Sequence, residues 1–152
     1  MTSGSDSLIC VDASVIAKWL LAESDTDRAL GLYADATRRG DRLLAPSYFA
    51  AEASSAIYKQ LQQGNLQLDE ALPLVERVEL LPIVTLSPPG LPLRAFEIAT
   101  QFNLKWIYDA FYVALAEIVG CDLWTADEKL HESVSGAFPN VRLLTHYQPA
   151  SP

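Results

Sequence analysis

The sequence predicts an α/β fold of three layers, with a mainly parallel sheet between two layers of helices. Short apolar segments typical of buried strands alternate with longer segments of helical periodicity along the 152 residues. The connections between successive strand segments are too long for hairpins, which favours parallel strands covered by helices on both faces. In such folds, ligands bind beyond the carboxyl ends of the strands.

The first half of the chain is expected to contain two strands and four helices. The segment Leu8-Ile-Cys-Val11 is apolar throughout, as a strand buried on both faces would be. Ser14 is suited to cap the helix that follows, and Gly40 and Gly64 are suited to end later helices. The expected elements are strands 8–11 and 42–45 and helices 14–21, 25–39, 46–63 and 68–80.

The second half continues the same alternation. The break Pro88-Pro89-Gly90 separates a third strand from the next helix. The segment Thr125-Ala-Asp-Glu128 has the form of a capping box and is expected to open the last helix. The expected elements are strands 83–86, 122–125 and 141–144 and helices 93–102, 108–119 and 125–134.

One domain covering residues 1–152, with an ordered core of about residues 8–145, is expected because no internal linker or repeat is visible. The first seven residues lack both the basic region and the apolar core of a signal peptide. No uncharged apolar run approaches the length of a membrane span. These features predict a soluble, cytoplasmic protein with no membrane partner.

The net charge of −8 and the isoelectric point of about 4.6 argue against a stable, non-specific DNA-binding module. They do not argue against a metal-dependent nuclease, because bound cations neutralise acids that face a phosphate. Cys10 and Cys121 are expected to be buried, reduced thiols. Together with two scattered histidines they do not form a recognisable zinc pattern.

Four acids are expected near the carboxyl end of the sheet. Asp12 directly follows the first strand, and Asp127 comes two residues after the fourth. Glu52 lies in the helix after the second strand, and Asp109 opens the helix 108–119. All four could therefore face one crevice. Taken singly, the three aspartates also suit ordinary turns and helix starts.

Glu52 is harder to explain as a surface residue. Phe49, Ala53 and Ile57 mark a buried helical stripe, and Glu52 lies at its edge. A carboxylate in that position needs a partner, which a cation shared with the other acids would supply. Oxygen ligands without His or Cys favour Mg²⁺ or Mn²⁺, and such a site suits hydrolysis of a phosphodiester.

Four segments in this order and spacing closely resemble the PIN-domain family, in particular its bacterial toxin branch, called VapC-like. The resemblance covers nearly the whole expected domain. The segments are Val11-Asp-Ala-Ser-Val15 with Lys18-Trp-Leu-Leu21, Pro46-Ser-Tyr-Phe-Ala-Ala-Glu52, Tyr108-Asp-Ala-Phe-Tyr-Val-Ala-Leu-Ala-Glu117 and Leu123-Trp-Thr-Ala-Asp-Glu-Lys-Leu130.

The resemblance implies a parallel sheet between helices and a metal-dependent endoribonuclease activity. Asp12, Asp109 and Asp127 match the family's metal-ligating aspartates, and Glu52 matches the glutamate that completes the acidic site. Ser14 and Thr125 match supporting hydroxyl residues, although helix capping explains these two equally well.

The resemblance also implies partners: an RNA substrate, a small antitoxin protein that covers the acids, and a second copy in a homodimer. Trp19, Leu20 and Leu21 could contribute to an antitoxin groove, although two of the three are expected in the core. Several basic residues are candidates for guiding RNA phosphates, or else belong to a solvated helix face: Lys18, Arg38, Arg39, Arg42 and Lys59.

Two other classes of function also place acids at the ends of parallel strands. A phosphoacceptor receiver domain needs an acid after its middle strand, but the segment 83–86 is followed by Ser87-Pro-Pro. A phosphatase with an aspartate nucleophile usually has a second aspartate two residues on, where this chain has Ser14. A PIN scaffold that binds RNA or a protein without cleaving remains the main alternative.

Overall fold

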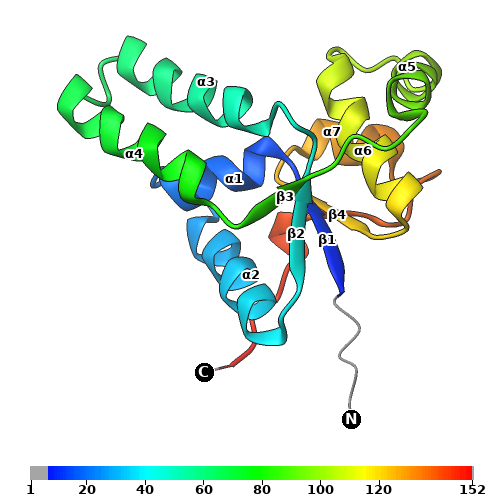
Figure 1. The fold of residues 1–152 in the computed structure, drawn as a ribbon, viewed down its shortest axis with the longest axis horizontal. Coiled ribbons are helices and arrows are strands. Elements are labelled where there is room, and N and C mark those ends of the chain that lie inside the picture. The colour runs from blue at the N-terminus through cyan, green and yellow to red at the C-terminus, as the bar shows by residue number, and fades with distance from the viewer. Residues whose placement is uncertain (1–6, 152) are drawn as a thin grey trace.

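Five parallel strands form one sheet in the computed structural model, which describes residues 7–151 (Figure 1). Their order across the sheet is β3-β2-β1-β4-β5, so the first strand of the chain is central. The strands are β1 (Leu8–Val11), β2 (Arg42–Ala45), β3 (Ile83–Thr85), β4 (Asp122–Thr125) and β5 (Val141–Leu143). The predicted α/β fold with a parallel sheet is confirmed. The expectation that residues 1–6 are not a signal peptide falls outside the described residues.

Helices cover both faces of this sheet. In Figure 1, α1 to α4 lie to the left of the strands, and α5, α6 and α7 lie to the right. The helices are α1 (Ala13–Leu20), α2 (Thr26–Arg39), α3 (Phe49–Gln62), α4 (Leu68–Leu80), α5 (Leu91–Gln101), α6 (Ile107–Val119) and α7 (Glu128–Val134), followed by a short 3-10 helix, η1 (Leu144–His146). None of the helices found in residues 7–151 has the length and apolar character needed to cross a membrane.

The core lies where β1 meets α6. Cys10 and Val11 are fully buried, as are Val113 and Ala114 on the facing helix. The Cys10 thiol lies 3.9 Å from the backbone carbonyl oxygen of Tyr112. A tightly packed central strand and helix give the site at the end of β1 a rigid base. Cys10 and Cys121 are free thiols as expected, but Cys121 is only half-buried.

Several element boundaries differ from the prediction by one to three residues, and the largest shifts are the starts of α3, at Phe49 instead of 46, and of α7, at Glu128 instead of 125. Helix α5 begins at Leu91, two residues early, because Gly90 takes a positive φ of 83° as its N-cap and Pro92 suits the first turn. Strand β5 ends at Leu143 because Leu144 already belongs to η1. The later start of α3 places Glu52 in the first turn of that helix.

The end of α1 belongs entirely to the core. Trp19, Leu20 and Leu21 are each only 7% exposed, so the idea that they line a partner groove is wrong. The indole nitrogen of Trp19 donates a hydrogen bond of 2.7 Å to the carbonyl of Ala29, which ties α1 to α2. Burial of such large side chains stabilises the fold by roughly 1.5–3 kcal/mol each.

Candidate active site at the carboxyl end of the sheet

Asp12 leaves the central strand and caps the helix that follows. Its backbone is extended, with φ −89° and ψ 172°. Its Oδ1 accepts hydrogen bonds from the backbone N–H groups of Ser14 and Val15, at 3.0 and 3.2 Å. The prediction that Ser14 caps this helix is therefore wrong, since the Asp12 side chain already reaches both orphan donors.

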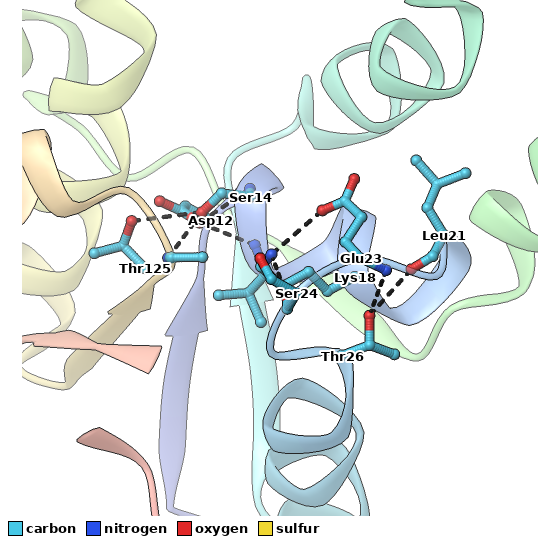
Figure 2. A network of polar contacts seen from close by, with 10 residues as sticks. Asp12, Ser14, Lys18, Leu21, Glu23, Ser24, Thr26 and Thr125 are labelled. Atoms are coloured by element: carbon cyan, nitrogen blue, oxygen red, sulfur yellow. Dashed lines mark hydrogen bonds and ion pairs between the residues drawn. The ribbon is translucent and has the colours of Figure 1, made fainter. Parts of the chain in front are cut away.

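Ser14 and Thr125 join the ends of β1 and β4 (Figure 2). The Ser14 hydroxyl hydrogen-bonds to Asp12 Oδ1, and Ser14 Oγ accepts a bond of 2.9 Å from the N–H of Ala126. Thr125 is fully buried, its Oγ1 lies 3.5 Å from Ser14 Oγ, and it accepts a bond of 3.0 Å from the N–H of Asp127. This network fixes the position of Asp12 relative to the loop that carries Asp127.

Asp127 caps α7. Its Oδ1 accepts a hydrogen bond of 3.1 Å from the N–H of Leu130. The predicted capping box from Thr125 to Glu128 is not the observed cap, because Thr125 is the last residue of β4 and its hydroxyl bonds to Asp127 instead. Asp12 and Asp127 thus come from adjacent parallel strands and play the same capping role.

Glu52 and Asp109 reach the same region from helices. Glu52 lies in the first turn of α3, is half-buried, and accepts a hydrogen bond of 2.7 Å from the hydroxyl of Tyr112. Tyr112 is 1% exposed and follows Asp109 by three residues, so the two share a face of α6. Sequence reasoning missed Tyr112 as a support for Glu52, although this spacing was a signal for it.

Burial and repulsion between neighbouring charges raise the pKa of three of these carboxyls, those of Asp12, Glu52 and Asp109. Burial raises the pKa of Asp12 to about 6, although hydrogen bonds from Ser14 and Thr125 act against the rise. Burial, followed by the charges of Asp12, Asp127 and Glu52, raises the pKa of Asp109 to about 7. Burial also raises the pKa of Glu52, with a further contribution from Asp12. Each of the four acids therefore lies within electrostatic reach of at least two of the others.

The four acids are not neutralised by basic side chains of the described chain. Among residues 7–151, no ion pair involves any of the four, and no hydrogen bond reaches the Asp109 carboxylate. The same described residues contain no three His, Cys, Asp or Glu side chains already drawn together as a metal-holding group. The acids share one region and repel one another, but their oxygens do not yet converge on a single point.

The basic residues expected to guide RNA are mostly occupied within the chain. Lys18 is 8% exposed, and its ammonium bonds to Glu23 at 3.3 Å and to the carbonyl of Ser24 at 2.7 Å (Figure 2). Arg38 and Arg39 form ion pairs with Asp35 and Asp41, and Lys59 is exposed on α3. The prediction that Lys18 guides phosphates is therefore wrong.

A pocket of about 310 Å³ opens beside Asp109 and Asp127. Its lining includes two exposed lysines, Lys105 and Lys129, and an exposed tryptophan, Trp106. The other lining residues are Asn103, Leu104, Leu130 and Ser133. Sequence reasoning did not single them out, although Lys129 lies inside one of the quoted motifs and Trp106 precedes Asp109 by only three residues.

The PIN domain family model matches residues 9–134, which include all four acids. This chain belongs to the PIN-domain family. The match spans the strands β1 to β4 and every element that carries a candidate site residue. Because PIN membership accounts for the acids at the strand ends, the receiver and phosphatase interpretations are no longer needed.

Relatives and a solved structure agree with this assignment. Ribonuclease VapC3 of Pyrobaculum aerophilum is 31% identical over 126 residues, which cover 82% of this chain and 92% of that protein. Ribonuclease VapC9 of Mycobacterium tuberculosis is 27% identical over 132 residues, which cover 87% and 95%. The crystal structure of PAE2754 from Pyrobaculum aerophilum matches with a TM-score of 0.62 and 25% identity over 91% of this chain and 92% of that one. The predicted likeness to VapC proteins is confirmed.

Proposed function

We propose that this PIN-domain protein is an endoribonuclease that depends on Mg²⁺ or Mn²⁺ held by Asp12, Glu52, Asp109 and Asp127. The observation that carries the proposal is the group of four mutually repelling acids at the carboxyl end of the sheet, without a basic partner in the described chain. Similarity to proteins named ribonucleases supports RNA as the substrate, and an RNA substrate implies action in the cytoplasm.

The chemistry of the donor set fits a hard divalent cation. All four groups offer carboxylate oxygens, and no Cys or His stands among them. A cation would offset both the burial and the neighbouring negative charges that raise the pKa of Asp109. When bound, the metal supplies activation of water and stabilisation of charge on the phosphodiester.

The chain's own residues would hold the acids ready for that cation. The backbone N–H groups at the start of α1 and α7 orient Asp12 and Asp127. Ser14 and Thr125 keep these two strand ends in register, as supporting residues. The Tyr112 hydroxyl turns Glu52 toward the site through a hydrogen bond of 2.7 Å.

A cleavage assay with a matched pair of variants tests the proposal. Purified protein is incubated with structured, end-labelled and circular RNAs in Mg²⁺, in Mn²⁺ and in chelator. Asp109→Asn removes a site carboxylate in the first turn of α6, whereas Asp69→Asn makes the same chemical change at an exposed position in the first turn of α4. Cleavage of circular RNA by wild-type protein and Asp69→Asn, but not by Asp109→Asn or in chelator, is expected.

Two other outcomes would contradict the proposed function. RNA binding without cleavage in either metal would favour the alternative of a PIN scaffold that holds RNA or a protein partner. Cleavage that continues in chelator and in Asp109→Asn would show that the four acids are not the active site.

We also propose that the protein is the toxin of a toxin–antitoxin pair and acts as a homodimer. The support is its similarity to VapC proteins and the apolar side chains that α4 and α5 expose, among them Leu68, Leu72, Leu93 and Phe96. Light scattering on the purified protein tests the dimer. The antitoxin is tested by co-expression with any small protein encoded by an adjacent gene, and a cognate antitoxin is expected to co-purify and to suppress cleavage.

A further inference from the structure

The pocket beside Asp109 and Asp127 has a composition unlike the rest of this acidic protein. Its lining brings Lys105, Lys129 and Trp106 together with the two acids. The ammonium of Lys105 lies 5.3 Å from the centroid of the Trp106 ring, so charge and indole occupy neighbouring positions. Trp106 is 57% exposed, which is unusual for the largest apolar side chain.

The charge in this pocket is available for a ligand. Most basic side chains of the described chain are engaged in ion pairs with Asp or Glu, and Arg42 has interactions of its own. Within residues 7–151, the four basic residues that form no ion pair are Lys59, Arg77, Lys105 and Lys129. Two of these four line one pocket, next to the acids of the candidate active site.

We propose that this pocket binds single-stranded RNA next to the bond that is cleaved, with Lys105 and Lys129 on a backbone phosphate and Trp106 stacked on an unpaired base. Proteins hold single strands by combining basic groups along the backbone with exposed aromatic rings under the bases. The inference rests on the proposed ribonuclease function for its substrate, but it concerns binding and not the cleavage step.

The acids on the pocket wall explain why binding should depend on the lysines. In chelator, a phosphate that approaches Asp109 and Asp127 meets two uncompensated negative groups, so a net attraction then requires cations on the same wall. An acidic peptide would satisfy the lysines equally well, but it would leave the exposed indole of Trp106 without a flat partner. The aromatic ring therefore favours RNA over a peptide as the ligand.

Fluorescence anisotropy with a short, labelled single-stranded RNA tests the site in the full chain. The strand is titrated with protein in Mg²⁺ and in chelator, and a gel confirms that it stays intact during the measurement. The test variants are Lys105→Gln/Lys129→Gln and Trp106→Leu. Arg77→Gln/Arg142→Gln is the matched control, because it removes two positive charges from exposed positions on α4 and β5. Thermal unfolding checks that all variants fold.

The expected result is a selective loss of RNA affinity. Trp106→Leu should weaken binding about fivefold or more, as loss of one stacked base does. The Lys105→Gln/Lys129→Gln variant should weaken RNA binding at least as much. For this variant, the slope of log K against log salt concentration should become shallower by about 0.7 for each phosphate that is no longer neutralised. The Arg77→Gln/Arg142→Gln control should stay within about twofold of wild type.

RNA affinity that is equal in the lysine pair and in its control, or absent from wild type in both buffers, would overturn the inference. So would a hexaglutamate peptide that binds wild type and not the lysine variant while RNA binding is unchanged. These results are separable from failure of the proposed function. If the wild-type protein binds RNA through Lys105 and Lys129 but never cleaves it, the binding site proposed here stands and the proposed ribonuclease function fails.

Discussion

The four acids divide into two pairs that are built differently. Asp12 and Asp127 follow adjacent strands, and each accepts hydrogen bonds from the backbone at the start of a helix. Glu52 and Asp109 project from the first turns of α3 and α6 and cap nothing. Within the described chain, Glu52 has one hydrogen-bond donor, Tyr112, and Asp109 has none.

This difference separates what the acids do for the fold from what they do for chemistry. A capping carboxylate offsets part of the cost of its burial through the N–H groups that it satisfies. Asp109 has no such compensation, and its pKa of about 7 reflects the free energy needed to keep it charged. A group that destabilises the folded protein and has no structural role points to function.

The largest expected effect is loss of activity from either pair. Asp12→Ala and Asp109→Asn should each reduce RNA cleavage by at least about 100-fold, the size of effect seen when one electrostatic stabiliser of a transition state is removed. Initial rates at saturating Mg²⁺ measure this, with Asp69→Asn as the unaffected control. Equal rates in wild type and Asp109→Asn would show that Asp109 is not needed for cleavage.

The next effect is on stability and should appear in only one pair. Asp12→Ala should lower the free energy of unfolding by about 1–2 kcal/mol, because two backbone N–H groups at the start of α1 lose their acceptor. Asp109→Asn should leave it unchanged or raise it, since a carboxyl that resists ionisation becomes neutral.

Urea unfolding in chelator measures both changes. Asp12→Asn is the matched control, because asparagine caps helices about as well as aspartate and should recover most of the loss. A larger loss of stability in Asp109→Asn than in Asp12→Ala would reverse the assigned roles of the two pairs.

A pH series sharpens the comparison in the metal-free protein. The pKa values of Asp12 and Asp109 in the folded protein, about 6 and about 7, lie above the value of about 4 in the unfolded chain. At a pH between the unfolded and the folded values, the folded state therefore binds more protons than the unfolded state. Linkage then requires the contribution of these groups to stability to fall as pH rises from about 4 to about 7.

The difference between wild type and Asp109→Asn isolates one carboxyl, and the variant should show the shallower decline over this range. Mg²⁺ should also flatten the wild-type decline, since a cation favours the charged carboxylates. A steeper decline in the variant than in wild type would contradict the raised pKa of Asp109.

The smallest expected effect comes from Tyr112→Phe. This change removes the hydroxyl that orients Glu52 and should cost about 1 kcal/mol of stability, the usual net value of one hydrogen bond. Cleavage should fall by less than in the variants of the four acids, and a Tyr58→Phe variant, exposed on α3, serves as control. Activity at the wild-type level would mean that Glu52 is positioned without Tyr112.

Much of this architecture could be predicted from the sequence. The apolar run of β1 and the helix-length connections indicated the parallel sheet, and the acids at the strand ends indicated where the site lies. These features are local in sequence, because a strand's composition and the residue that ends it are read directly from the chain.

What escaped prediction depends on distances between segments. Ser14 looked like a cap, but the extended backbone of Asp12 delivers the capping oxygen, and the Ser14 hydroxyl turns to Ala126 across the sheet. Trp19 looked available to a partner, but α2 covers it. The pocket with Lys105 and Lys129 joins residues from the segment before α6 and from α7, which no periodicity connects.

A titration with Mn²⁺ tests the central claim most directly, because it asks whether the two pairs of acids form one site without requiring the RNA target. Calorimetry would compare wild type with Asp12→Asn, Glu52→Gln, Asp109→Asn, Asp127→Asn and the control Asp69→Asn. The account predicts binding by wild type and by the control, and a clear loss of affinity in each of the four site variants. Wild-type affinity in Asp109→Asn or Glu52→Gln, or no binding by wild type, would contradict it.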